Sequence, residues 1–170
     1  MRKHSSNVRL TELIHNAYAI IGSVTPIKAD CGKLCDKACC TEEDAGMLLF
    51  PGEEVIYSKV PGFRIENIEY MDAPGIKLLL CDGKCDRALR PLACRIFPVA
   101  PKVEKDSSVT VQPDIRARLM CPIWDLKHVD KIFIKTVEKA FVLLAEDEDM
   151  LAFIQLLSLE QHQLWRFFKK

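Results

Sequence analysis

The sequence has no net charge, because 24 Lys and Arg residues balance 24 Asp and Glu residues among 170. Proteins that wrap nucleic acid carry a clear basic excess, so this balance argues against a nucleic-acid partner. Long apolar runs are also missing. No stretch approaches the roughly 18 apolar residues of a membrane span, and polar residues interrupt the segment after Arg2 and Lys3 before it resembles a signal peptide. We therefore expect a soluble cytoplasmic protein without a membrane span.

Common catalytic motifs are absent as well. The sequence contains no G-x-S-x-G, no H-E-x-x-H, no Walker A loop and no G-x-G-x-x-G. It has only four histidines, and we expect His15 and His128 to be structural residues on helices. The sequence therefore leaves open whether the protein is an enzyme.

The sequence is rich in cysteine, with eight in 170 residues. A chain of this length folds without disulfides, and clustered thiols in a reducing compartment are more often metal ligands or redox groups than bridges. Soft thiolates favour zinc, Cu(I) or an iron–sulfur cluster. All eight are candidate metal ligands, in two groups that each begin with Cys-x3-Cys-Asp: Cys31, Cys35, Cys39 and Cys40, then Cys81, Cys85, Cys94 and Cys121.

The adjacent pair Cys39-Cys40 is harder to assign to one ion. Neighbouring side chains usually point apart. We therefore expect either two metal centres or one spare thiol, in preference to both sulfurs on the same ion.

The hydrophobic pattern predicts one α+β domain over residues 1–170. Apolar residues spaced three and four apart predict a helix over 10–21. Thr41, followed by three acidic residues, is typical of a helix start, so we expect a helix from there to about Phe50 and a short helical piece over 53–59.

Short strands are expected in the middle of the chain, over 64–70 and 75–80 and as a hairpin of 99–103 with 109–111. A helical pair over about 124–168 follows, with one helix through Leu126 to Leu144 and a second from Met150 to about Phe168. The second helix is apolar almost all round, so it is either wrapped by the fold or buried against a homodimer or another protein partner. The expected architecture has helices at both ends and a small antiparallel sheet in the middle, organised around a cysteine-rich metal site.

A basic segment surrounds Cys94: residues 77–102 contain six Lys or Arg residues and two Asp residues. Pro91 fits the first turn of a helix, which would put Cys94 near a helix N-terminus where Arg90 and Arg95 favour the thiolate. We expect Arg90 and Arg95 to contact the anionic centre. The alternative is a solvated basic surface.

Two elements of the sequence resemble the YkgJ-type cysteine cluster family, described as a zinc- or iron-chelating domain. The upstream element ends in Cys39-Cys40, although its spacing is Cys-x3-Cys-x3-Cys-Cys and the family usually shows Cys-x2-Cys-x4-Cys-Cys. The downstream element matches Arg-Pro-x-x-Cys-Arg-x-x-Pro closely, through Arg90, Pro91, Cys94, Arg95 and Pro98.

The resemblance covers about residues 31–121 and implies metal binding, with zinc and iron both open. Longer members of the family are linked to methylation of flagellin lysines. This chain is too short for a large additional catalytic domain, so that activity is not transferred to it.

Zinc and an iron–sulfur cluster make different demands. Structural zinc takes four thiolates and ties distant loops together, and a [4Fe–4S] cluster also takes four. The absence of zinc-knuckle Cys-x2-Cys pairs counts slightly against zinc, and the absence of a ferredoxin-type Cys-x2-Cys-x2-Cys run counts against the commonest iron–sulfur cluster. Taken together, these absences favour Zn²⁺ by a small margin over iron or a [4Fe–4S] cluster. We expect a small metal-binding protein; the alternative is an iron–sulfur redox or group-transfer enzyme, related to methylation if the family resemblance extends that far.

Overall fold

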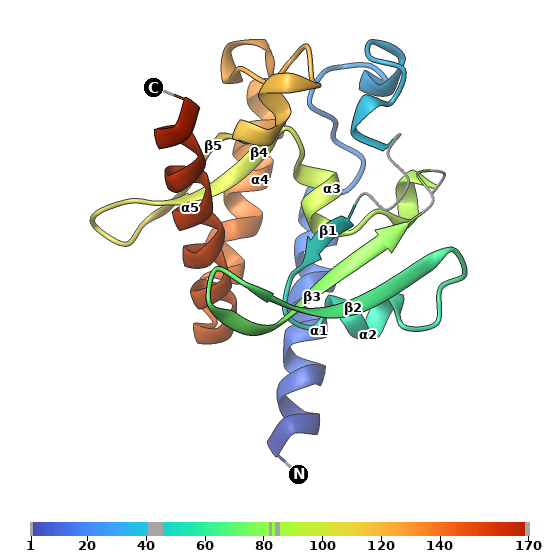
Figure 1. The fold of residues 1–170 in the computed structure, drawn as a ribbon, viewed down its shortest axis with the longest axis vertical. Helices are drawn as coiled ribbons and strands as arrows, with labels where there is room; N and C mark the ends of the chain where they lie inside the picture. Colours follow the sequence, from blue (N-terminus) through green and yellow to red (C-terminus); the bar gives the residue numbers. More distant parts are fainter. Residues whose placement is uncertain (1, 41–45, 82, 84–85, 169–170) are drawn as a thin grey trace.

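A computed structural model of the chain describes the backbone of residues 2–40, 46–81, 83 and 86–168, and the side chains from residue 7 onwards. Long helices lie at both ends of the chain and two small antiparallel sheets lie between them, which confirms the predicted α+β class (Figure 1). The long helices are α1 (Arg2–Ile21), α4 (Lys131–Leu144) and α5 (Glu148–Phe168).

The larger sheet has three strands in the order β1-β3-β2, all antiparallel. Its strands are β1 (Gly46–Leu49), β2 (Phe63–Tyr70) and β3 (Ala73–Cys81). Phe63 pairs with Cys81, so the cysteine lies at the last residue of β3, the central strand of this sheet. The second sheet is the predicted hairpin of β4 (Val99–Val103) and β5 (Val109–Pro113).

The predicted helix ending near Phe50 is wrong. Residues Gly46–Leu49 form β1 and pair with β3, and Thr41 and the acidic residues after it lie outside the described part of the chain. Three consecutive residues, Leu48, Leu49 and Phe50, are buried, which an amphipathic helix does not allow but a strand covered on both faces does. The short helical piece that follows is confirmed as α2 (Glu53–Tyr57).

The hydrophobic core joins α1, α4 and α5 to the two sheets. Phe50, at the end of β1, packs edge-to-face against Phe153 of α5 at 5.0 Å between ring centroids. One face of α5 is buried within the chain through apolar side chains that include Met150, Ile154 and Leu157. The fold therefore covers one face of this helix and leaves the opposite face exposed, so the helix is not wrapped all round.

The helix predicted from Leu126 begins later. Asp130 caps α4, since its carboxylate accepts a hydrogen bond from the Ile132 N–H at 2.7 Å. His128 lies before this cap, in the 3-10 turn η5 (Leu126–His128), and so the prediction that places it within a long helix is wrong. No helix in the described part of the chain is long and apolar enough to cross a membrane.

Candidate functional site

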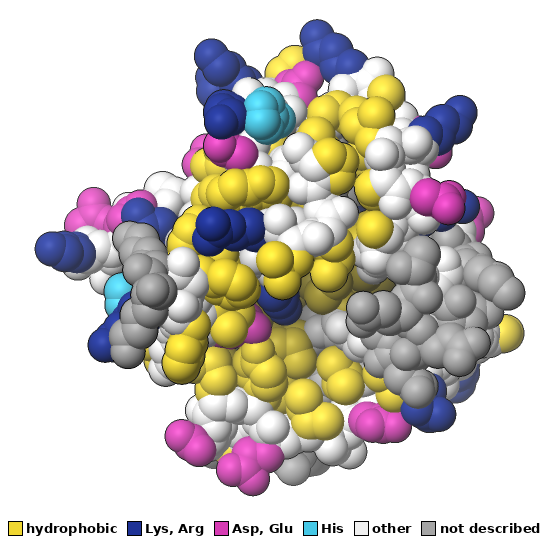
Figure 2. All heavy atoms as spheres, turned by 45° about the horizontal axis from the view of Figure 1, so that its top comes forward, with side chains coloured by type: hydrophobic (Ala, Val, Ile, Leu, Met, Phe, Trp, Pro, Cys, Tyr) yellow, Lys and Arg dark blue, Asp and Glu magenta, His cyan; other side chains and the backbone are white. Residues whose placement is uncertain are grey.

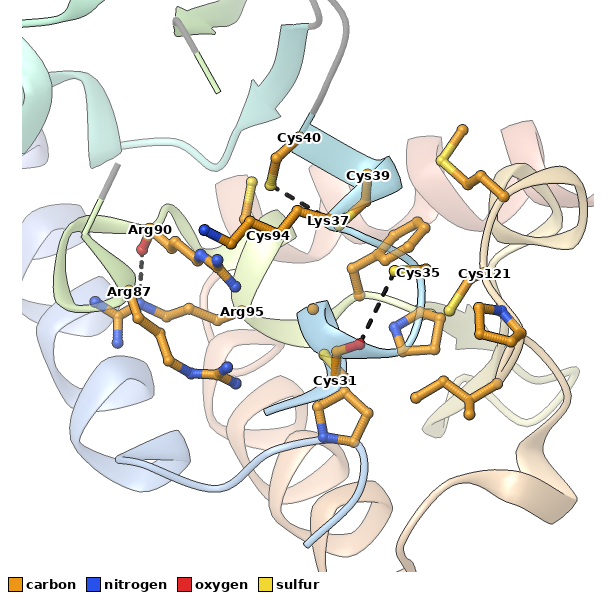
Figure 3. Close-up of a pocket in the computed structure, with 17 residues that line it drawn as sticks. Cys31, Cys35, Lys37, Cys39, Cys40, Arg87, Arg90, Cys94, Arg95 and Cys121 are labelled. Carbon is orange, nitrogen blue, oxygen red and sulfur yellow. Dashed lines mark hydrogen bonds between the residues drawn. The ribbon is translucent and has the colours of Figure 1, made fainter. Parts of the chain in front are cut away.

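Six of the predicted ligand cysteines line one cavity of about 40 Å³. They come from three parts of the chain: residues 31–40, which contain the turns η1 (Cys31–Lys33) and η2 (Ala38–Cys40) with Cys35 between them, the helix α3 (Leu92–Ile96), and the turn after η4 (Ile115–Leu119). Figure 3 shows these side chains around the cavity. The lining cysteines are Cys31, Cys35, Cys39, Cys40, Cys94 and Cys121.

The two cysteine groups seen in the sequence are mixed in space. Cys81 lines a neighbouring cavity, also of about 40 Å³, together with Cys39, Cys40 and Cys94. Cys85 lies outside the described residues. Cys94 and Cys121 thus lie around the same cavity as the upstream cysteines. Cys39, Cys40 and Cys94 line both cavities, whereas Cys81 lines only the second one.

The expectation that Cys39 and Cys40 point apart is wrong. Their sulfur atoms lie 3.8 Å from each other and form a thiol–thiol contact. Both lie in the 3-10 turn η2, where the Cys40 N–H donates to the Lys37 carbonyl at 2.7 Å. Asp36 and Lys37, with φ angles of 48° and 57°, lead into this turn. A 3-10 turn therefore replaces the extended backbone in which neighbouring side chains diverge.

The contact between Cys39 and Cys40 favours ionisation of one of the two thiols over the other. The hydrogen bond from Cys39, together with the charges of Arg90 and Lys37, lowers the pKa of Cys40 to about 6. The same hydrogen bond and burial raise the pKa of Cys39. Burial also raises the pKa of Cys121. Cys40 is therefore the thiol of this pair that ionises at neutral pH and is ready to bind a soft cation.

Both residues predicted to contact the anionic centre border the same cavity. Arg90 and Arg95 both line it, and in Figure 3 they lie with Arg87 on one side while Cys35 and Cys121 lie on the other. The Arg95 guanidinium donates to the carbonyls of Arg90 at 2.7 Å and Ala88 at 2.6 Å. It also lies over the ring of Tyr18, with 4.2 Å from Cζ to the centroid.

Gly83 brings the loop after β3 against the Cys40 segment, and the sequence analysis missed it. Its φ is +72°, and a Cβ atom at this position would lie 1.9 Å from the Cys40 carbonyl oxygen. Only glycine allows two backbones to approach this closely. The contact holds the two cysteine-bearing segments side by side.

Glu53 is a second feature that the sequence analysis missed. Its side chain is fully buried and accepts hydrogen bonds from the backbone N–H groups of Phe50 at 2.8 Å and Leu92 at 2.7 Å, and from the Tyr18 hydroxyl. Burial raises the pKa of Glu53 to about 7, against the opposing effect of these donors and of Arg95. Because Leu92 is the first residue of α3, this carboxyl anchors the short helix that carries Cys94.

Figure 2 brings the cysteine-bearing end of Figure 1 forward. Hydrophobic side chains, among which cysteine is counted, gather across the middle of this face, and most charged side chains lie nearer its rim. Within residues 2–40, 46–81, 83 and 86–168, no three His, Cys, Asp or Glu side chains converge in the arrangement of metal ligands. The thiols lie around one cavity, and a shared ion would require them to move closer together.

Comparisons of the chain with models of protein families, with curated proteins and with solved structures found no match. The functional argument therefore depends on the chemistry of the cysteine cavity itself.

Proposed function

We propose that the protein binds a metal ion, in the first place Zn²⁺, through its clustered cysteine thiolates. The observation that carries this proposal is the cavity lined by six cysteines from three separate parts of the chain. Apolar packing alone has no need of sulfur from so many places, whereas a soft cation does. The residues that would hold the ion belong to the set Cys31, Cys35, Cys39, Cys40, Cys94 and Cys121, with Cys81 and Cys85 as the remaining candidates.

The size of the cavity favours an ion over a cluster. One water molecule needs roughly 10–15 Å³ of this kind of volume, so the cavity of about 40 Å³ has room for only a few atoms. A [4Fe–4S] cluster, with four irons and four sulfides, needs more room than this volume provides.

The spacing of the adjacent thiols also suits zinc. With Zn–S bonds of about 2.3 Å, the sulfurs of a tetrahedral site lie about 3.8 Å from each other. The Cys39 and Cys40 sulfurs are 3.8 Å apart. This pair thus matches one edge of such a tetrahedron.

The role that best suits this arrangement is structural. None of the residues of η1 or η2 is buried, so burial of apolar side chains does little to order these turns. A bound ion would stabilise the folded state by joining them to α3 and to Cys121. Arg90 and Arg95 would offset the excess negative charge of a zinc ion with four thiolates.

Elemental analysis of protein purified without oxygen tests the proposal. We expect bound zinc and a colourless sample. A brown sample that absorbs near 400 nm would favour the iron–sulfur redox or group-transfer enzyme instead. A metal-free sample with eight free thiols would overturn both.

Single substitutions test the ligand set. We expect Cys94→Ser to lose metal and stability, because Cys94 lines both cysteine cavities. His128→Ala removes a potential ligand from an exposed position away from the cavity, and we expect it to change neither property. Unchanged metal content in Cys94→Ser would show that the ligand assignment is wrong.

A further inference from the structure

A second cavity, much larger than the cysteine cavity, lies between the end of α1 and the segment that leads into α3. Its volume is about 290 Å³, close to the roughly 300 Å³ at which small-molecule sites begin. Arg87, Arg90 and Arg95 line it, together with Ser23 and the apolar side chains of Ile21 and Val24. The cavity therefore combines three cationic groups, one hydroxyl and an apolar wall.

The positive charge of this cavity is not balanced within its own lining. Among the described residues that line it, none is Asp or Glu. The nearest acidic residue in the sequence, Asp86, directs its carboxylate to the Ala88 N–H at 3.0 Å and caps the turn η3 (Arg87–Leu89). The guanidinium groups of Arg87 and Arg95 beside one cavity repel each other, and an anion between them relieves that repulsion.

Arg95 is fixed in place before any ligand arrives. Its Nε–H and one Nη2–H bond to backbone carbonyls, and its guanidinium plane lies over Tyr18. Tyr18 is in turn held by its hydrogen bond to the buried Glu53. An arginine held in this way loses little side-chain entropy on binding and keeps its other N–H donors available.

We propose that this cavity binds a small molecule through an oxyanion, a carboxylate or a phosphate group, held by Arg87 and Arg95. The planar guanidinium fork matches both groups with two parallel hydrogen bonds. Ser23 offers a further donor, and Ile21 and Val24 provide the apolar contact for the carbon skeleton of the ligand. The site adjoins the proposed metal centre, since Arg87, Arg90 and Arg95 line both cavities, but Ser23, Ile21 and Val24 line only this one.

Calorimetric titration tests this proposal on the metal-loaded protein as purified, with inorganic phosphate and succinate as probes at constant ionic strength. We expect saturable binding of at least one probe. Tighter binding of phosphate identifies a phosphate site, and tighter binding of succinate a carboxylate site. Binding of neither at millimolar concentration would overturn the proposal.

Two variants and a matched control locate the site. We expect Arg87→Gln to weaken binding about tenfold or more, while Arg166→Gln, which removes the same charge from the exposed end of α5, leaves it unchanged. Ser23→Glu adds a carboxylate at an exposed position of the lining and should abolish binding while every arginine stays in place.

Equal weakening by Arg87→Gln and Arg166→Gln would show that the effect is only general charge attraction, and would overturn the proposal. Zinc content is measured in the same three variants. Where it stays unchanged, a loss of anion binding is not a consequence of metal loss.

Discussion

At the scale of single residues, Glu53 connects the fold to the candidate site. A fully buried carboxyl is costly unless it is hydrogen-bonded or protonated, and Glu53 accepts bonds from β1, α3 and Tyr18. Since its pKa is about 7 in the folded protein and about 4.5 when exposed, the folded state holds a proton that the unfolded state has released. The stabilisation of the folded state by this proton is therefore complete below pH 4.5 and is lost as the pH rises to about 7.

This difference predicts the pH dependence of stability. The shift corresponds to roughly 3 kcal/mol of unfolding free energy lost between pH 4.5 and 8. Denaturant unfolding at a series of pH values should show this loss in the wild type and in Glu69→Gln, an exposed carboxylate of β2. Glu53→Gln should be less stable at acidic pH and lack the slope. The same slope in Glu53→Gln would refute the assignment.

Gly83 gives a second prediction at the residue scale. Gly83→Ala would force a methyl group into the Cys40 carbonyl, so the loop after β3 and the η2 segment must separate. Gly62 has a similar φ of +83° but nothing within 4 Å of a Cβ atom. Gly62→Ala therefore carries the cost of the φ angle alone, about 1 kcal/mol. We expect Gly83→Ala to lose more stability than this control and to bind less metal, measured by chemical denaturation and elemental analysis.

The residues of the candidate site were only partly predictable from the sequence. The cysteines and Arg90 stood out because their types and spacing indicate soft-metal chemistry. Nothing local distinguishes Glu53 from Glu54 beside it, because burial is decided by segments far away in the chain. Cys39 and Cys40 lie close together in the 3-10 turn η2, and the two left-handed residues before it, Asp36 and Lys37, are not glycines and so gave no signal of this turn.

At the scale of elements, periodicity predicted most helices and strands. It was wrong where a local preference opposed long-range pairing. The acidic residues after Thr41 favour a helix start, but Met47–Leu49 are strand residues because β3 offers backbone partners and both faces are covered. A capping signal is worth about 1 kcal/mol, which is less than the burial of two leucines and a phenylalanine.

Gln161 joins α5 to the turn that leads towards Cys121. It is fully buried, accepts a hydrogen bond from the Ile115 N–H at 2.8 Å and donates to Asp114 at 3.2 Å. Gln161→Leu would leave the Ile115 N–H without this partner, at a cost of about 1–3 kcal/mol. Gln163→Leu, on the exposed face of α5, should stay within about 0.5 kcal/mol of the wild type. Equal midpoints of thermal unfolding for the two variants would contradict this role.

At the scale of the whole molecule, the structure divides into a hydrophobic core and a cysteine-bearing end. The core joins α1, α4, α5 and both sheets, whereas η1 and η2 contribute no buried residue. The sequence predicted both parts but not the mixing of the two cysteine groups. Spacing along the chain says which thiols share a loop, and only the tertiary packing brings Cys94 and Cys121 to the same cavity as Cys31.

This division predicts how the protein responds to metal removal. With the proposed metal bound, a chelator under reducing conditions would remove the link between the η1 and η2 turns and the rest of the site, but it would leave the apolar contacts of α4 and α5 in place. Amide hydrogen exchange over residues 31–40 should accelerate at least about tenfold, while exchange in α4 and α5 stays nearly unchanged, and added Zn²⁺ should restore protection. Exchange over 31–40 that does not respond to metal would show that these turns are ordered by the polypeptide alone. A simultaneous loss of protection in α4 and α5 would instead mean that the core and the cysteine-bearing end unfold as one cooperative unit.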